Sequence, residues 1–278
     1  MTRIAFRKMH GLGNDFVVLD QRRDPYPIDA AAARAVADRR TGIGCDQLLL
    51  LERPHDERAQ AFMRILNPDG SEAEACGNGT RCVAALLAAE AGRRDVAIET
   101  VAGLLRATVD GTGMATVDMG EPRFGWRDIP LAREMNTLHV GLRRGPLSDP
   151  VCTNIGNPHA TFFVDDADAI DLVALGPGLE NDPLFPARAN IGVAAVRDRT
   201  NIRFRVWERG AGITRACGSG ACAAVVAAHR RGLVDDRVTV ELDGGRLTIA
   251  WAGRGSVLMT GSATLSFEGS FDPVSLRR

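Results

Sequence analysis

Residues 75–82 read ACGNGTRC, and residues 216–222 read ACGSGAC. Each stretch places a cysteine directly before a Gly-x-Gly segment, and an alanine-rich run that is typical of a helix follows each of them. Two matched thiols, Cys76 and Cys217, therefore stand at two matched helix starts. This arrangement indicates one active site built from two halves, with one cysteine from each half.

The repeat extends well beyond the two cysteines. Arg64 matches Arg205 at an offset of 141 residues, and Val96 matches Val238 at an offset of 142. A repeat unit of about half the chain predicts two similar domains rather than a solenoid of short units.

The local sequence pattern predicts strands and a few helices in each half. Short apolar or β-branched segments bounded by Gly, Pro or Asp predict strands at 16–20, 48–51, 62–66, 96–100 and 105–109. Alanine-rich runs followed by glycine predict helices at 29–40, with Asp29 as the N-cap, and at 80–91 and 221–231. We therefore expect each half to be a strand-rich sheet around one central helix.

Composition and charge exclude several classes of function. A net charge of −1 shows no basic footprint for nucleic acid or for an anionic membrane. The opening sequence MTRIAFRKMHGLGNDF lacks the apolar stretch of a signal peptide. We therefore expect a cytoplasmic enzyme that acts on a small molecule, with no nucleic-acid or membrane partner, and both a monomer and a homodimer stay open.

The lysine and cysteine content argues against two common cofactors. Lys8 is the only lysine in the chain, whereas a pyridoxal-phosphate enzyme needs a lysine for its Schiff base. The spacings Cys76-x5-Cys82 and Cys217-x4-Cys222 lack the Cys-x2-Cys pattern of zinc sites. We therefore expect neither a cofactor nor a metal.

A cysteine at a helix start suits acid–base chemistry. The unpaired N–H groups and the macrodipole of a helix N-terminus lower the pKa of a thiol, and the same N–H groups bind anions such as a carboxylate. If two such elements faced one carbon, one thiolate could take the Cα proton and the other thiol could return a proton to the opposite face. This chemistry predicts a racemase or an epimerase.

With these residues in view, the chain resembles the diaminopimelate epimerases over nearly its whole length. The resemblance rests on KMHGLGNDF (8–16), GIGCDQ (42–47), NPDGSEAEACGNGTRC (67–82), GNPH (156–159), RANIG (188–192) and ERGAGITRACGSGACAA (208–224). It implies interconversion of LL- and meso-2,6-diaminopimelate without a cofactor, by a thiolate and a thiol, in lysine and peptidoglycan precursor synthesis.

The resemblance also implies a fold. We expect an α+β protein of two pseudo-symmetric β-rich domains, each a mixed sheet wrapped around a central helix, with the active site in the cleft between them. The expected halves are residues 1–121 with 265–278, which carry Cys76, and residues 122–264, which carry Cys217.

Carried over position by position, the resemblance assigns Cys76 and Cys217 as the acid/base pair. The positions that match the cradle for the reacting carboxylate are Gly77, Asn78, Gly218 and Ser219. The other positions that match substrate-binding residues are Asn14, Gln47, Asn67, Asn157, Asn190, Glu208 and Arg209. His159 and Glu208 match residues that tune the thiols.

One difference between the halves bears on the substrate. Asn67 and Glu208 are equivalent in the repeat, each nine residues before its cysteine. A symmetric scaffold with an asymmetric lining fits a ligand whose two ends must be distinguished. Two alternatives stay open: a cysteine-pair racemase that acts on proline or hydroxyproline in a small pocket, and a redox switch that uses Cys76 and Cys217.

Overall fold

The computed structural model describes residues 3–73 and 76–273, so Ala75 of the first motif lies outside the described residues. Contacts within the chain divide it into two compact units. The first unit comprises Met1–Val117 with Gly261–Arg278, and the second comprises Asp118–Thr260.

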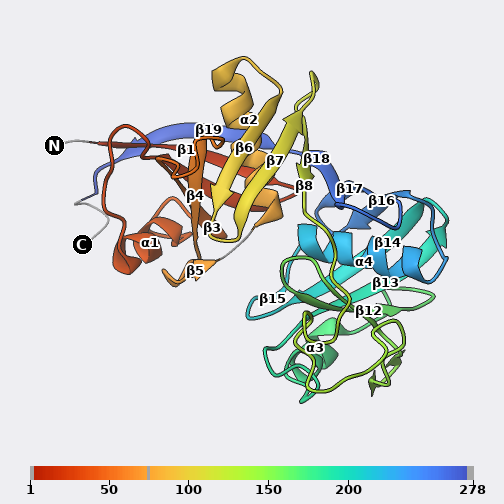
Figure 1. The fold of residues 1–278 in the computed structure, drawn as a ribbon. Helices are drawn as coiled ribbons and strands as arrows, with labels where there is room; N and C mark the ends of the chain where they lie inside the picture. The colour runs from red at the N-terminus through yellow and green to blue at the C-terminus, as the bar shows by residue number, and fades with distance from the viewer. Residues whose placement is uncertain (1–2, 74–75, 274–278) are drawn as a thin grey trace. The chain divides into compact units, whose positions relative to one another are not determined.

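The first unit contains a mixed sheet. Its strands are β1 (Ile4–Gly11), β2 (Asn14–Asp20), β3 (Gln47–Glu52), β4 (Ala61–Leu66), β5 (Glu72–Ala73), β6 (Asp95–Thr100), β7 (Gly103–Val109), β8 (Met114–Asp118) and β19 (Thr264–Phe271). The pairs β2–β3 and β4–β6 are parallel, and the pairs β1–β2, β3–β4, β4–β5, β6–β7 and β7–β8 are antiparallel. The last strand, β19, returns to lie antiparallel to β1 (Figure 1).

The second unit repeats this order of pairing. Its strands are β11 (Val151–Asn154), β12 (Pro158–Phe163), β13 (Asn190–Asp198), β14 (Asn201–Glu208), β15 (Gly212–Ile213), β16 (Arg237–Leu242), β17 (Gly245–Ala250) and β18 (Leu258–Ser262). The pairs β12–β13 and β14–β16 are parallel, and the others are antiparallel. A separate two-stranded ribbon joins β9 (Arg143–Arg144) to β10 (Leu147–Ser148).

The helices occupy equivalent places in the two units. Helix α1 (Ala30–Ala37) follows β2, and α3 (Leu172–Glu180) follows β12. Helix α2 (Gly77–Ala91) follows β5, and α4 (Gly218–Arg230) follows β15. The α+β class with a mixed sheet and a central helix in each half is therefore confirmed.

Three details of the predicted helices are wrong. Helix α1 ends at Ala37 rather than at residue 40, although Asp29 is its N-cap as predicted. Helices α2 and α4 begin at Gly77 and Gly218 rather than at residues 80 and 221, because the cysteines themselves serve as N-caps. Helix α3 was not predicted, because Gly176, Pro177 and Gly178 interrupt its sequence. Its place in the repeat, equivalent to that of α1, was the available signal.

Buried leucines of β3 link the sheet of the first unit to both of its helices. Leu48 and Leu50 belong to the apolar cluster that packs around α1. Leu49, which lies between them, points to the opposite face of the sheet because side chains alternate across a strand. A Cβ built at Gly79, in the first turn of α2, would lie 3.1 Å from the Leu49 methyl groups. The strand therefore fixes the start of α2, where Cys76 lies.

Helix α4 is the buried centre of the second unit. All residues from Ala221 to Ala228 are buried, and small alanine side chains let the surrounding strands approach closely. It contacts β11, β12, β13, β14, β16 and β17. Among the described residues, no helix combines the length and the apolar character needed to span a bilayer.

Candidate active site

Cys76 is the N-cap of α2. Its Sγ accepts the backbone N–H of Gly79 at 3.3 Å, and its carbonyl oxygen accepts the N–H of Thr80 at 2.8 Å. The side chain is half-buried. Its sulfur thus faces the unpaired N–H groups of a helix start, which favour the thiolate.

Cys217 has the same role at α4. Its Sγ accepts the N–H of Gly220 at 3.4 Å and lies 3.6 Å from Ser219 Oγ. A Cβ at Gly79 or at Gly220 would lie 3.5 or 3.2 Å from the respective sulfur. The last glycine of each Cys-Gly-x-Gly motif therefore leaves room for the sulfur to cap the helix.

The two thiols differ in their surroundings. The Cys76 thiol is 4.0 Å from the amide oxygen of Asn14, a neutral group. Cys217 is only 4% exposed, and the carboxylate of Glu208 acts on it. Burial, followed by the negative charge of Glu208 and its hydrogen bond, raises the pKa of Cys217 well above its ordinary value. In this structure Cys217 is therefore a neutral thiol at pH 7.

Replacing Glu208 tests how far its charge raises the pKa of Cys217. We expect Glu208→Gln to lower the pKa of Cys217, because the change removes a negative charge that opposes the thiolate. The measurement is the pH dependence of alkylation at Cys217, followed by mass spectrometry of its peptide. Glu241→Gln, which removes an exposed partner of Arg197 in the same unit, is the control and should leave the profile unchanged. If Glu208→Gln leaves the pH profile of Cys217 alkylation unchanged, or moves it to higher pH, the charge of Glu208 is not what raises the pKa of Cys217.

The Asn14 amide connects Cys76 to a charged network in the first unit. Asn14 Oδ1 accepts Asn78 Nδ2 at 3.1 Å, and Asn14 Nδ2 donates to Asp46 Oδ2 at 2.9 Å. Arg39 binds both Asp46 and Asp15. Burial of Asp15 opposes ionisation, but hydrogen bonds from Arg39 and Lys8 outweigh it and hold the pKa of Asp15 at about 2. The network fixes which end of the Asn14 amide faces the thiol.

A second pair of amides lies in the same unit. Gln47 Nε2, at the start of β3, donates to Asn67 Oδ1 at 2.9 Å. Asn67 Nδ2 donates to Ser71 Oγ at 3.1 Å across the turn after β4. Both side chains are half-buried, so they keep polar surface for a ligand.

In the second unit, His159 is fully buried on β12. Its Nε2 lies 2.7 Å from Asn157 Oδ1, and since an amide oxygen only accepts, Nε2–H donates. Burial, with a smaller contribution from the charge of Arg209, lowers the pKa of His159 to about 3. The imidazole is therefore neutral, and its hydrogen bond goes to Asn157 rather than to Cys217.

A buried neutral histidine makes stability depend on pH. The unfolded chain binds a proton at this residue below its ordinary pKa of 6.5, whereas the folded chain resists protonation until about 3. We expect the free energy of unfolding to fall as the pH drops below 6.5, by up to ~1.4 kcal/mol per pH unit from this group. Urea unfolding at several pH values should show a shallower decline for His159→Gln. A variant with the same slope as the parent would contradict the assignment.

Asn190 and Arg209 are joined through the backbone. Asn190 is 3% exposed, its Nδ2 donates to the carbonyl of Pro158 at 3.0 Å, and its Oδ1 accepts the N–H of Arg209 at 2.9 Å. Both ends of this amide thus hold main chain in place. The Arg209 guanidinium is exposed, and its Nη1 donates to the carbonyl of Ala187 at 3.1 Å. Arg209 is thus the member of the pair placed to meet a ligand.

The structure brings most predicted site residues together within each unit. Cys76 groups with Asn14 and Asn78, and Gln47 pairs with Asn67. Cys217 groups with Glu208 and Ser219, His159 pairs with Asn157, and Asn190 pairs with Arg209. Gly77 and Gly218 are the first residues of α2 and α4.

Sequence reasoning missed two supporting residues. Asp46, which binds Asn14, directly precedes Gln47 in the GIGCDQ segment. Thr214 donates its hydroxyl to Glu208 and stands six residues after it. Each lies within a motif that contains predicted site residues, and that was the available signal. In residues 3–73 and 76–273, no group of three or more His, Cys, Asp or Glu side chains is arranged to hold a metal ion.

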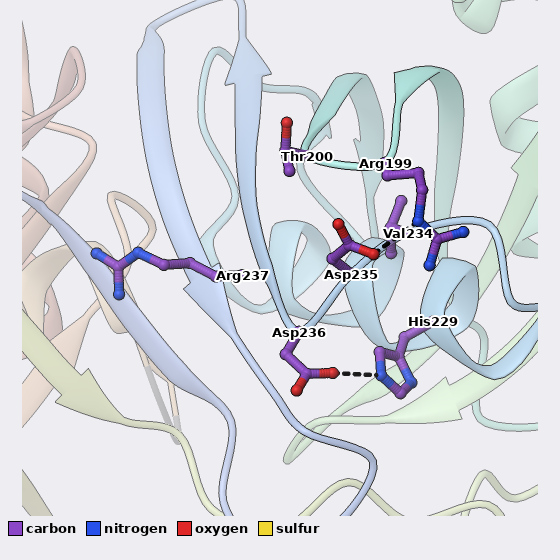
Figure 2. A pocket seen from close by; sticks show the side chains of 7 residues that line it. All are labelled: Arg199, Thr200, His229, Val234, Asp235, Asp236 and Arg237. Carbon is purple, nitrogen blue, oxygen red and sulfur yellow. Dashed lines mark hydrogen bonds and ion pairs between the residues drawn. The ribbon is translucent and has the colours of Figure 1, made fainter.

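An open pocket of the second unit lies elsewhere. It is lined by Arg199, Thr200, His229, Val234, Asp235, Asp236 and Arg237 (Figure 2). Arg199 donates to Asp235 at 2.7 Å, and His229 lies 3.0 Å from Asp236, so these side chains bind one another. His229 is near the C-terminal end of the 13-residue α4, roughly 20 Å along the helix from Cys217. The pocket is therefore not part of the thiol site.

The sequence is similar to those of known proteins of one family. The family model described as "Diaminopimelate epimerase" matches residues 6–125 and 151–266. The diaminopimelate epimerase of Rhodospirillum centenum is 60% identical over 271 residues, covering 98% of this chain and 93% of that protein. The diaminopimelate epimerase of Acidiphilium cryptum is 57% identical over 271 residues, covering 98% of this chain and 97% of its own.

Solved structures share the fold at low sequence identity. A PhzF-family phenazine biosynthesis protein of Bacillus anthracis matches with a TM-score of 0.70 at 18% identity, over 98% of this chain and 100% of its own. A hydroxyproline epimerase of Agrobacterium vitis matches with a TM-score of 0.69 at 17% identity, over 99% of this chain and 94% of its own. These two likenesses show the fold alone.

Proposed function

Because the chain belongs to the diaminopimelate epimerase family, we propose that it interconverts LL-2,6-diaminopimelate and meso-2,6-diaminopimelate without a cofactor. The observation that carries the proposal is the pair of N-cap thiols, Cys76 and Cys217, in a chain with 60% identity to a relative of that name. Such thiols are positioned acid–base groups, and one on each face of a carbon can invert its configuration.

The unequal thiols suggest how the two roles are divided. Cys217 is a neutral thiol beside Glu208 and is therefore the proton donor in one direction of the reaction. Cys76, beside a helix start and the neutral Asn14, takes the Cα proton as a thiolate in that direction. In the reverse direction the roles exchange.

The same helix starts provide a site for the reacting carboxylate. The backbone N–H groups at Gly77–Asn78 and Gly218–Ser219 lie in the first turns of α2 and α4, where an anion is stabilised by unpaired donors and by the helix dipole. Binding there places the negative charge that develops at Cα next to positive ends of dipoles.

The second end of diaminopimelate needs its own partners. Its carboxylate requires donors and its ammonium group requires acceptors, since unpaired buried charge is costly. Exposed Arg209 and the amide groups of Asn14, Gln47, Asn67 and Asn157 can serve this carboxylate, and the amide oxygens can serve the ammonium group. The carboxylate of Glu208 acts on Cys217 and can therefore serve the ammonium group of the reacting end. Asn190 contributes by holding Arg209.

Two alternatives make different predictions. A cysteine-pair racemase for proline or hydroxyproline has support from the fold alone, at 17% identity to the hydroxyproline epimerase. A redox switch would use Cys76 and Cys217 without turning over an amino acid. Purified enzyme should convert LL-diaminopimelate to the meso form and leave L-proline and trans-4-hydroxy-L-proline unchanged. Turnover of L-proline or trans-4-hydroxy-L-proline but not of diaminopimelate would favour the proline racemase. If none of the three amino acids is turned over, the redox switch is favoured.

The wider setting of the reaction is also a proposal. We place the enzyme in the cytoplasm, in the synthesis of lysine and peptidoglycan precursors, because both products are built from diaminopimelate. A monomer and a homodimer both accommodate the chemistry, and sedimentation of the purified chain would distinguish them.

A further inference from the structure

Glu180, at the end of α3, is a buried carboxylate that the proposed mechanism does not use. It is 5% exposed and accepts three hydrogen bonds. Its Oε2 accepts Trp207 Nε1 at 2.7 Å, and its Oε1 accepts the backbone N–H of Gly210 at 2.9 Å and Arg188 Nη1 at 3.2 Å. A buried carboxylate with three donors is fully engaged, so each donor is held in a defined place.

These donors surround the turn that carries the charged residues of the site. Trp207 and Glu208 end β14, and the chain reverses through residues 209–211 into β15. Gly210 has φ +75°, a conformation that favours glycine, and the N–H of this residue points at Glu180. Glu180 therefore binds the turn on both sides of Arg209.

The packing of Trp207 brings its indole to the same carboxylate. A Cβ at Gly176 of α3 would lie 2.4 Å from Trp207 Cδ2, so the ring lies directly against the backbone of α3. A Cβ at Gly212 would lie 3.5 Å from Trp207 Cη2, at the far end of the ring system. The glycines allow the indole to fit between α3 and the turn, with its N–H on Glu180.

We propose that Glu180 is a positioning residue for substrate binding: it locks the turn at residues 209–212 so that Arg209 presents a fixed positive charge to the carboxylate at the distal end of the substrate. This inference rests on the proposed function, because it assigns the distal carboxylate of diaminopimelate to Arg209. Glu180 itself does not contact substrate and acts through the turn.

Glu180→Gln tests the role with little change in shape. A carboxamide offers one acceptor atom and two N–H donors where the carboxylate offers two acceptors, so it cannot satisfy Trp207 and Gly210 together. We expect KM for LL-diaminopimelate to rise about 10-fold with kcat within about 2-fold of the parent, the pattern of lost binding that ground state and transition state share. We also expect at least ten-fold faster hydrogen exchange at the Gly210 amide, read by NMR without substrate.

The matched control is Glu241→Gln, which removes an exposed ion pair with Arg197 in the same unit and should change neither KM nor exchange at Gly210. A parallel loss of kcat with KM unchanged, or unaltered exchange at Gly210, would overturn the positioning role. Exchange at Gly210 is measured without turnover. If Glu180→Gln speeds exchange at Gly210 but the parent enzyme does not epimerise diaminopimelate, the proposed function is contradicted. The conclusion that Glu180 holds the turn in place would still stand.

Discussion

Replacing either N-cap cysteine is expected to reduce kcat for epimerisation by roughly 10²- to 10⁴-fold, the usual contribution of a positioned acid or base. Cys76→Ser and Cys217→Ser are the informative variants. Serine is a preferred N-cap, so it keeps the acceptor for the Gly79 or Gly220 N–H and preserves the helix start. Its hydroxyl, however, does not ionise near neutral pH. Steady-state rates with LL-diaminopimelate measure the loss, and circular dichroism verifies the fold.

Cys82→Ala supplies the control for this pair of variants. Cys82 is fully buried in α2, where burial raises the pKa of its thiol to about 12 and excludes it from acid–base chemistry near neutral pH. We expect near-normal kcat from this variant. Wild-type turnover by Cys76→Ser or Cys217→Ser would show that the thiols are not the acid and the base.

Gly42→Ala is expected to destabilise the first unit by about 3 kcal/mol or more, the upper end of the range for overpacking. After α1 the chain folds back onto the last turn of the helix, and the N–H of Gly42 donates to the carbonyl of Asp38 at 3.0 Å. A Cβ at Gly42 would lie 2.0 Å from the carbonyl oxygen of Ala35 and 2.8 Å from that of Val36. Backbone atoms cannot move aside without breaking this return of the chain. Urea unfolding measures the change.

Gly111→Ala is the matched control in the same unit. A Cβ there would meet no atom within 4 Å, and the φ of Gly111 lies outside the left-handed range. We expect this variant to remain within about 0.5 kcal/mol of the parent, as surface substitutions usually do. Equal stability of Gly42→Ala and Gly111→Ala would contradict the close approach at Gly42.

The order of elements was predictable because the sequence repeats. The offset that relates Arg64 to Arg205 relates β4 to β14, and the structure has the same pairing around both strands. Helix propensity alone begins α2 and α4 too late, because Gly-Asn-Gly and Gly-Ser-Gly disfavour helix, whereas the repeated Cys-Gly-x-Gly motif correctly placed both cysteines at helix starts. The cysteine sulfurs cap these first turns, and that contact exists only in three dimensions.

The candidate site was predictable as residue types and less so as roles. Asn190 stays a predicted ligand by its motif, and the structure adds a second role, because its buried amide binds backbone at both ends. Glu180 gave no signal, since it lies just beyond a Gly-Pro-Gly segment that is not typical of a helix. The difference between the thiols was visible only as Asn67 against Glu208 in the repeat. In the structure, the carboxylate of Glu208 acts on the sulfur of Cys217 and raises its pKa.

The origin of the new hydrogen at the inverted carbon tests the central claim of two opposed thiols most directly. Protiated LL-diaminopimelate is turned over in deuterated water, and product and recovered substrate are analysed by mass spectrometry in the first few per cent of reaction. If separate thiols serve the two faces, every molecule of the meso product carries one solvent deuteron at the inverted carbon, and the recovered LL isomer keeps its protium. Meso product that retains the substrate's own hydrogen would contradict the account, because it would require one group to take and return the same proton.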